Sequence, residues 1–233
     1  MDKGELMFVN SNLDLEHAVR NVEGTHATQR LAQGEVANGF PHTNAQTLVA
    51  LWSLVETVVK DVTAGWLQAF PDKLTNDKLR KAKVPAVAFL KADDADRFSM
   101  LVDAAKGSEQ GGSTGIDHLE RMLKLASLRV VTGDDATEDD KRVRHTLNEI
   151  CGLRNVIVHR GSVVDQKLLN DCPWLSQQMT TGQRVEIGLQ ELRGYASMGI
   201  WSYGVKLWAR VHRELGLEPG LPFRRGSADD EEP

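Results

Sequence analysis

Apolar residues recur at helical spacing over most of the chain. The clearest run predicts a helix from about residue 44 to 70, because its apolar residues alternate in spacing between four and three and form one seam. The seam consists of Leu48, Trp52, Val55, Val59, Val62 and Trp66, widened by Leu51, Val58 and Leu67. Polar residues before this run can cap the helix, and Pro71 predicts its end.

Similar patterns predict four further helices, near residues 86–105, 116–131, 138–159 and 190–215. A charged group from Lys91 to Arg97 interrupts the apolar face of the first. Alternating residues from Arg184 to Leu189 predict one short strand or extended segment. The sequence therefore predicts an all-α fold, a helical bundle of four to six helices with at most one short β segment.

Three parts are expected along the chain. Residues 44–217 carry the bundle, and residues 1–43 form an N-terminal helical appendage. Residues 218–233 form an acidic tail, in which Asp229, Asp230, Glu231 and Glu232 occur without a basic residue after Gly226. This composition predicts disorder in the tail.

Composition and charge narrow the function classes. Hydrophobic residues make up 41% and charged residues 26% of the 233 residues, as in ordinary globular proteins. The net charge of -5 gives no global sign of nucleic-acid binding. Residues 141–160, however, carry a local net charge of +4, from one acidic residue, Glu149, and five basic ones: Lys141, Arg142, Arg144, Arg154 and Arg160.

The sequence offers no signal for a metal, a cofactor or a membrane span. The two cysteines, Cys151 and Cys172, form no C-x-x-C pair, and the seven histidines lack metal-site spacing. The first residues lack the layout of a signal peptide, and no run of 18 apolar residues occurs. We therefore expect a cytoplasmic protein without metal or cofactor.

Arg154 stands where the predicted helix 138–159 calls for a hydrophobic residue. Val143, Leu147, Ile150, Arg154 and Ile157 follow one another at spacings of four, three, four and three, which places them in one stripe on one face. A charge in such a stripe costs free energy unless it meets a counter-charge, an interface or a ligand. A functional role is one common reason for accepting that cost.

His159 follows Arg154 by five positions, and the two side chains have complementary chemistry. A histidine can exchange a proton with a ribose hydroxyl near neutral pH, and an arginine can hold a phosphate, so the pair suits RNA cleavage without a metal. On an ideal helix, five positions separate the two side chains by about 140° and about 7.5 Å along the axis. Either the helix ends by His159 and the ring swings back, or a second, antiparallel copy completes the site.

Glu56 and Lys60 lie on the predicted helix 44–70. Glu56 is a candidate counter-ion for Arg154 or a brace for the site. The alternative is an ordinary pair between Glu56 and Lys60, worth about 0.3–0.5 kcal/mol. The two interpretations are evenly balanced. For Asp165, capping of a short helical turn is favoured over orientation of His159.

The motif Arg154-Asn155-x-x-x-His159 resembles the R-x4-6-H motif of the HEPN superfamily, which favours a polar residue directly after the arginine. Glu56-x-x-x-Lys60 resembles a second element of that family, and the run from His159 to Leu175 is similar to the segment after its motif. The resemblance implies a helical, commonly dimeric protein. In members that keep the motif it implies metal-independent endoribonuclease activity, often in toxin–antitoxin or phage-defence systems.

By this resemblance, Arg154 and His159 would be catalytic, and Asn155, Glu56 and Lys60 would support them. Arg160 and Arg144, from the basic window, are candidate RNA-binding residues. The expected partners are RNA, a second copy of the chain and a nucleotidyltransferase-like antitoxin. A second hypothesis stays open: a non-catalytic HEPN-like module that dimerises or binds a partner or nucleotide, in which the motif residues are structural.

Overall fold

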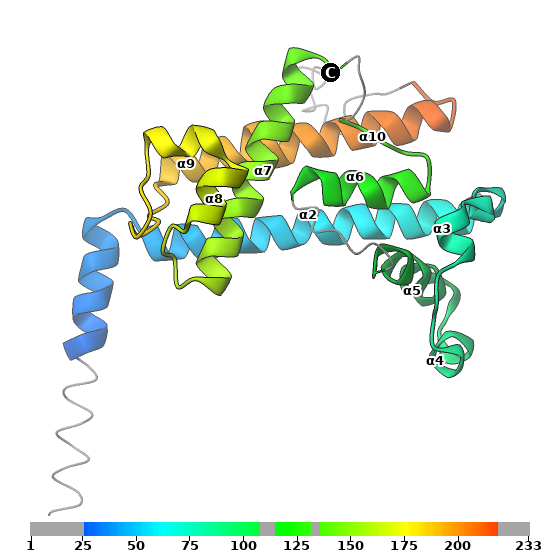
Figure 1. Ribbon diagram of the computed structural model, residues 1–233, viewed down its shortest axis with the longest axis horizontal. Helices are drawn as coiled ribbons and strands as arrows, with labels where there is room; N and C mark the ends of the chain where they lie inside the picture. The colour runs from blue at the N-terminus through cyan, green and yellow to red at the C-terminus, as the bar shows by residue number, and fades with distance from the viewer. Residues whose placement is uncertain (1–25, 108–114, 132–135, 219–233) are drawn as a thin grey trace, which may run out of the picture.

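The computed structural model describes residues 26–107, 115–131 and 136–218, and in these ranges the fold is all-α (Figure 1). The prediction of an all-α helical bundle is confirmed. The described residues contain no strand, and the segment predicted as a strand contributes only an isolated antiparallel bridge between Val163 and Arg184.

Five long helical units build the bundle, and short helices connect them. The long units are α2 (Pro41–Ala69), α5 (Asp94–Gly107), α6 (Ile116–Leu125), α7 (Glu138–His159) and a continuous unit of α9 (Leu189–Gly194), a π-helical segment (Tyr195–Trp201) and α10 (Ser202–Glu214). The connectors are a 3-10 turn (Pro71–Thr75), α3 (Asp77–Arg80), α4 (Ala86–Lys91), α8 (Gln166–Asp171) and a second 3-10 turn (Pro173–Gln177).

Two predicted helices are shorter than their apolar patterns suggested. The helix expected over 86–105 is divided at Ala92, whose backbone is extended, and the Asp93 carboxylate accepts a hydrogen bond from the Asp96 amide at 2.8 Å. A side chain that caps a new helix competes with continuation of the old one. The helix expected over 116–131 ends at Leu125, because Ser127 adopts a left-handed φ of 61°.

The long helix α2 has clear start and stop signals. Pro41 occupies the first turn, where an absent N–H costs nothing, and Phe70 and Pro71 end the helix. The Glu35 carboxylate accepts hydrogen bonds from the amides of His42 and Thr43, each at 3.2 Å. Glu35 belongs to the helical residues 26–37, which stand off the body of the protein in Figure 1.

The predicted appendage and tail fall mostly outside the described part of the chain. Residues 1–25 and 219–233, which include the four acidic tail residues, lie beyond the described ranges. The described residues 26–37 are helical, as expected, with Leu31 and Val36 exposed. None of the described helices has the length and apolar content that a membrane span requires.

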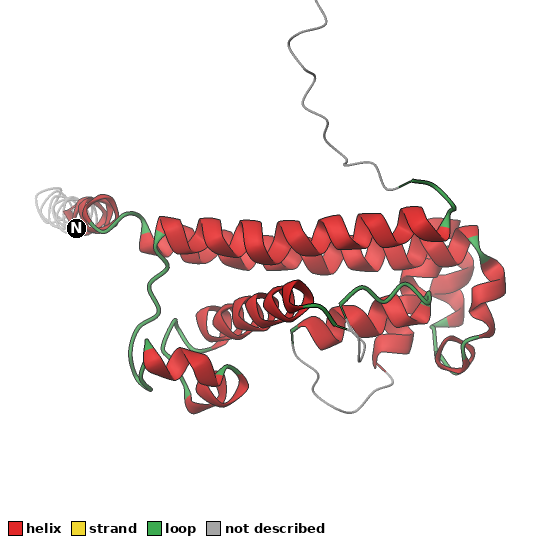
Figure 2. Ribbon diagram, turned by 90° about the horizontal axis from the view of Figure 1, so that it is seen from above, coloured by secondary structure: helices red, strands yellow, loops and turns green. Residues whose placement is uncertain are grey.

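Helix α7 crosses both α2 and the π-helical segment and forms the centre of the core (Figures 1 and 2). Leu48, Trp52 and Val59 of the predicted α2 seam are buried, whereas Val58, at the edge of that seam, is 44% exposed. The crossing with the π-helical segment depends on Gly199. A Cβ at this position would lie 2.9 Å from Thr146 Cγ2 and 3.0 Å from Ile150 Cδ1.

A buried carboxylate closes the core on the side of α6. Glu120 is 2% exposed and accepts hydrogen bonds from the amides of Val130 and Val131, at 2.8 and 3.3 Å, and from the Tyr203 hydroxyl at 3.1 Å. Burial raises the pKa of Glu120, and these hydrogen bonds lower it in part. The carboxylate thus ties the segment after α6 to α10.

Replacing Gly199 by alanine is expected to lower the free energy of unfolding by about 1–3 kcal/mol, because the added methyl group overpacks the crossing with α7. Gly65→Ala in α2 is the matched control, since a Cβ there meets nothing within 4 Å and alanine favours a helix by about 1 kcal/mol. Urea unfolding measures the free energy of unfolding of both variants. Equal stability of the two variants would contradict the close crossing.

The stability difference between the wild type and Glu120→Gln is expected to depend on pH. A carboxyl group with a raised pKa in the folded state contributes stability fully below its unfolded pKa, near 4.5, and loses it as pH rises through the folded value. The wild type should therefore lose stability relative to Glu120→Gln between pH 4.5 and 8 in urea titrations. If the wild type instead gains stability relative to Glu120→Gln as pH rises, burial does not dominate the pKa of Glu120.

Candidate functional site

The candidate site lies at the C-terminal end of α7. The helix begins with a capping box in which Thr137 and Asp140 exchange hydrogen bonds, and it ends where Gly161 adopts a φ of 61°. The predicted bounds, 138–159, agree with the structure. Four residues of its apolar stripe, Val143, Leu147, Ile150 and Ile157, are buried, and Arg154 of the same stripe is half-buried.

Arg154 and His159 meet within one chain. Arg154 Nη1 lies 3.3 Å from His159 Nε2. The ideal-helix argument separated the two side chains by about 140°. It does not hold for the side-chain ends, because His159 is the last residue of α7 and the long Arg154 side chain extends to its ring. A second copy of the chain is therefore not needed to bring this pair together.

The contact places the two side chains in hydrogen-bond reach. A guanidinium carries only donors, so in a hydrogen bond between them Arg154 Nη1 donates and His159 Nε2 accepts through its lone pair. Since His159 is exposed, its ring lies within reach of a substrate at the surface of the protein.

Asn155 and Cys151 support Arg154 from behind. Asn155 Oδ1 accepts a hydrogen bond from Arg154 Nη1 at 3.0 Å, and Asn155 Nδ2 makes a weak contact with Cys151 Sγ at 3.8 Å. Cys151 Sγ accepts from the Gly115 amide at 3.2 Å. The chain of contacts links the motif to the residue before α6. Arg154 Nε is buried without a hydrogen-bond partner among the described residues.

Glu56 and Lys60 take partners other than those predicted. Glu56 Oε1 lies 3.9 Å from His118 Nε2, and Lys60 Nζ lies 2.6 Å from Asp103 Oδ2. In the described ranges no ion pair joins Glu56 to Arg154 or to Lys60, so both predicted ion pairs of Glu56 were wrong. Its role as a brace for the site stays a prediction. The charges of Glu56 and Arg154 shift the pKa of Cys151 in opposite directions, which places both near this thiol.

The two predicted RNA-binding arginines already have acidic neighbours. Arg144 forms an ion pair with Asp117, and Arg160 Nε lies 3.3 Å from Asp165 Oδ2. Asp165 also accepts the Leu168 amide at 2.8 Å and caps α8, which confirms the capping role expected for it. Arg160 remains largely exposed, so its guanidinium is open to solvent on the sides away from Asp165.

A cavity of about 340 Å³ opens beside His159, between α7 and α8. Its wall is formed by Gly152, Asn155, Val156, His159, Arg160, Asp165, Lys167, Leu168 and Asp171. Arg154 is not part of this wall, but Asn155 and His159, which both contact Arg154, are. The two cations of the wall each pair with a carboxylate: Arg160 with Asp165, and Lys167 with Asp171.

Three residues of this region were not predicted from the sequence. Lys167 and Asp171 carry no motif, and their role in the cavity depends on the angle between α7 and α8. Gly152 permits that angle, because a Cβ there would lie 2.6 Å from Leu168 Cδ1.

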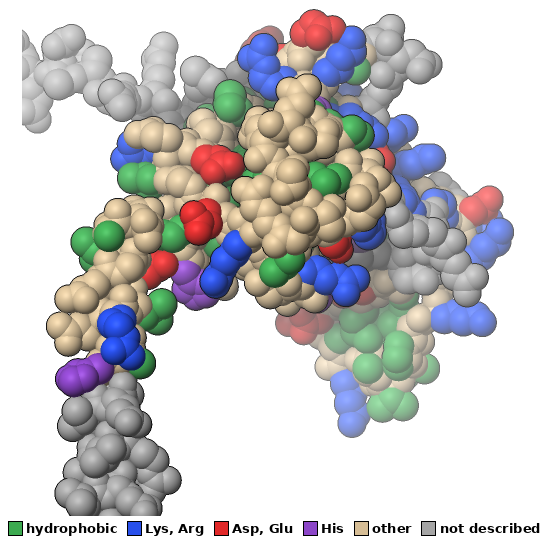
Figure 3. Space-filling model, turned by 60° about the vertical axis from the view of Figure 1, so that its left-hand side comes forward, with side chains coloured by type: hydrophobic (Ala, Val, Ile, Leu, Met, Phe, Trp, Pro, Cys, Tyr) green, Lys and Arg blue, Asp and Glu red, His purple; other side chains and the backbone are tan. Residues whose placement is uncertain are grey.

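Charges around the site are mixed. Figure 3 shows Lys and Arg side chains interspersed with Asp and Glu side chains over one face of the molecule. The basic window 141–160 is thus compensated locally by neighbours such as Asp117 and Asp165. Among the described residues, no group of three or more His, Cys, Asp or Glu side chains is arranged to hold a metal ion.

Comparisons with family models, with curated proteins and with solved structures found no match to this chain. The resemblance to the HEPN superfamily therefore rests on the motif residues alone. Their geometry, and not a relationship with a characterised protein, has to carry a functional argument.

Both cysteines are expected to resist alkylation in the folded protein. Cys151 and Cys172 are buried free thiols. Burial raises the pKa of the Cys151 thiol, and it raises the pKa of the Cys172 thiol to about 12. Only the thiolate reacts, so iodoacetamide at pH 8 should label neither residue in native protein and both in guanidinium. Mass spectrometry of the two samples measures this. Rapid labelling of native Cys151 would contradict the buried position behind Asn155.

Proposed function

We propose that this protein is a metal-independent endoribonuclease, with Arg154 and His159 as its catalytic residues. One observation carries the proposal: the 3.3 Å contact that holds the exposed His159 Nε2 beside the Arg154 guanidinium. A base and a fixed positive charge at one surface point suit a reaction in which a proton leaves and negative charge builds on a phosphate.

RNA supplies its own nucleophile, the ribose 2′-hydroxyl. In the proposed reaction the Arg154 guanidinium turns from His159 Nε2 to the phosphate, and the lone pair that this frees on Nε2 takes the proton of the hydroxyl. The 2′-oxygen then attacks the adjacent phosphorus. The P–O5′ bond breaks, and the leaving 5′-oxygen receives a proton from the imidazolium or from water. The products are a 2′,3′-cyclic phosphate and a 5′-hydroxyl, so atoms and charges balance without a metal.

Arg154 is proposed to stabilise the charge on the phosphate. Its Nη1 is engaged by Asn155 and His159, whereas no described residue pairs with its Nη2. Nη2 can therefore donate to a phosphate oxygen. Asn155 holds the guanidinium in place and is a positioning residue. Glu56 and Lys60 act at a distance, through the electrostatics around Cys151 and the attachment of α5 to α2.

Homodimerisation and a nucleotidyltransferase-like antitoxin remain proposals that rest on the resemblance. An exposed apolar face supports the dimer. Leu54 and Val58 of α2 and Trp201 of the π-helical segment are 56%, 44% and 55% exposed, and they border an apolar cavity of about 270 Å³. A toxin–antitoxin or phage-defence setting would explain why a general RNA-cleaving activity needs a partner that restrains it.

A second candidate function is a non-catalytic binding module. The contacts from Arg154 through Asn155 and Cys151 to the Gly115 amide favour it, because they connect α7 to the start of α6 as a structural brace would. In that case Arg154→Ala should lower the melting temperature clearly. In the proposed nuclease the same change should abolish activity and leave stability nearly unchanged, because no described carboxylate forms an ion pair with Arg154.

Cleavage assays test the nuclease. Wild-type protein with EDTA should cleave single-stranded RNA and leave 2′,3′-cyclic phosphate ends, and His159→Ala should lower the rate by about 10²–10⁴-fold. Arg154→Lys, which keeps the charge and loses the planar fork, should also reduce the rate. His145→Ala on the same helix is the control, because its ring stacks on Trp174 at 3.5 Å and is not part of the site.

The outcome separates the two candidate functions. Equal cleavage by wild type and His159→Ala, or no cleavage of any class of RNA, would exclude the proposed mechanism. Loss of cleavage in Arg154→Ala together with a large fall in melting temperature would favour the structural brace.

A further inference from the structure

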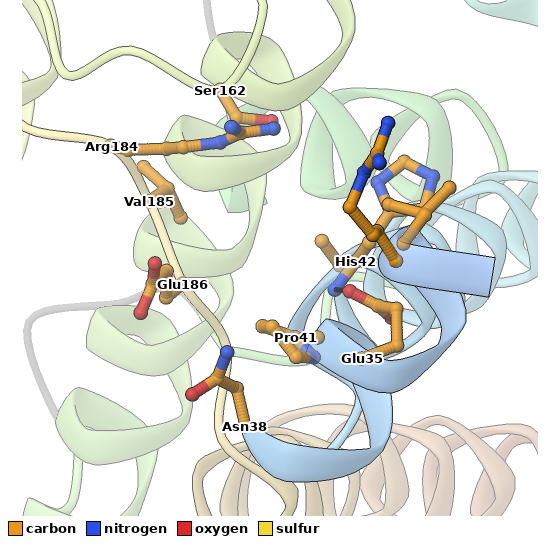
Figure 4. Close-up of a pocket in the computed structure, with 12 residues that line it drawn as sticks. Glu35, Asn38, Pro41, His42, Ser162, Arg184, Val185 and Glu186 are labelled. Atoms are coloured by element: carbon orange, nitrogen blue, oxygen red, sulfur yellow. Dashed lines mark hydrogen bonds between the residues drawn. The ribbon is translucent and has the colours of Figure 1, made fainter. Parts of the chain in front are cut away.

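A second cavity, of about 410 Å³, lies on the other side of the turn that follows α7. The helical residues 26–37, the start of α2 and two loop segments enclose it, and Figure 4 shows their side chains facing one another. Arg184 extends from the loop wall toward Ser162, opposite Glu35 and His42. The cavity therefore brings together groups from three distant parts of the sequence.

The cations of this cavity are not compensated. Neither Arg30 nor Arg184 forms an ion pair with a carboxylate of the described ranges. The Glu35 carboxylate accepts hydrogen bonds from the amides of His42 and Thr43, at 3.2 Å each, and so interacts with the positive end of the α2 helix dipole. Glu186 is the remaining acid in the wall. The arginines of the second cavity thus differ from the basic residues of the first cavity, Arg160 and Lys167, which each pair with a carboxylate.

The two cavities are lined by neighbouring residues of one turn. His159 and Arg160 line the first, and Ser162, three residues after His159, lines the second. The turn between them is tight, because the Ser162 amide donates to the Val156 carbonyl at 3.2 Å and Ser162 adopts a φ of 63°. The Val185 amide in turn donates to the Ser162 carbonyl at 2.8 Å, which fixes the segment of Arg184 against this turn.

We propose that the second cavity binds an RNA phosphate next to the scissile one, with Arg184 as its principal ligand. This inference rests on the proposed function. A strand that runs from His159 over the turn at Ser162 brings the phosphate next to the scissile one to the Arg184 guanidinium, which has no ion pair among the described residues. Arg30 faces the same space and adds a second positive charge, while the Ser162 hydroxyl and the Asn38 amide offer further donors.

Arg184 therefore acts in substrate binding and not in the chemical step. A substrate with one phosphate, a dinucleoside monophosphate, places nothing in the second cavity. Arg184→Ala should leave its cleavage unchanged and lower kcat/KM for a longer single-stranded RNA about tenfold. Arg193→Ala on α9 is the matched control, since it removes an exposed arginine outside both cavities. Glu186→Gln removes a negative charge from the wall of the second cavity and should raise kcat/KM for the longer RNA.

Binding supplies a readout that is separate from cleavage. In a His159→Ala background, a fluorescein-labelled single-stranded RNA of random sequence should bind about tenfold more weakly when Arg184 is also alanine. The slope of log affinity against log salt concentration should fall by about 0.7, the value for one phosphate contact on a single strand. The Arg193→Ala control should retain both the affinity and the slope.

The outcomes distinguish this inference from the proposed function. Two results would overturn the second cavity as a phosphate site while the wild type still cleaves RNA, which leaves the proposed nuclease intact. One is an equal loss of kcat/KM for the longer RNA in Arg184→Ala and Arg193→Ala. The other is a loss of cleavage by Arg184→Ala on the dinucleoside monophosphate as well. Absence of both cleavage and RNA binding in the wild type would overturn both.

Discussion

The close crossing of α7 over α2 and the π-helical segment sets the position of every candidate functional residue. Gly199 allows α7 to approach the π-helical segment so closely that a single methyl group would overlap Thr146. The crossing buries one stripe of α7 and leaves its C-terminal end, with His159, at the surface. Because cores are packed to the density of organic crystals, this arrangement leaves little freedom in the direction of α7. The site is consequently carried by a rigid element, and only the turn after it is irregular.

Arg154 shows how a charge is accommodated in an apolar stripe without a counter-ion. Its side chain is half-buried, and its Nη1 lies within hydrogen-bond distance of Asn155 Oδ1 and His159 Nε2. A carboxylate at this place would neutralise the charge of the guanidinium, so partners other than a carboxylate preserve its electrostatic reach. The cost falls on Nε, which is buried without a partner among the described residues. Such a cost is typical of sites where function and stability compete.

The sequence allowed the helices to be predicted and Arg154 and His159 to be selected as a candidate pair, but it did not allow their surroundings to be predicted. The α7 bounds followed from local signals, the capping residues and Gly161, which act within a few residues. The partners of Glu56 and Lys60 could not be predicted in this way. They are His118 and Asp103, which come from other helices, and local sequence patterns do not predict how helices pack against one another. The separation of Arg154 and His159 was misjudged for a different reason: helical angles describe Cβ directions, whereas a long arginine side chain ends far from its Cβ. The first cavity likewise depends on the approach of α8 at Gly152.

An acidic protein can bind RNA only if positive charge is concentrated where the strand lies. Counter-ions such as Asp117 and Asp165 compensate much of the basic window along α7, so its formal charge of +4 overstates the attraction. At the turn after His159 the balance is different, since Glu35 is engaged by the start of α2 while Arg184 and Arg30 stay unpaired within the described chain. Attraction confined to this turn favours a strand held at two or three phosphates over non-specific coating of the surface, because each phosphate contact adds separately to affinity and to salt dependence.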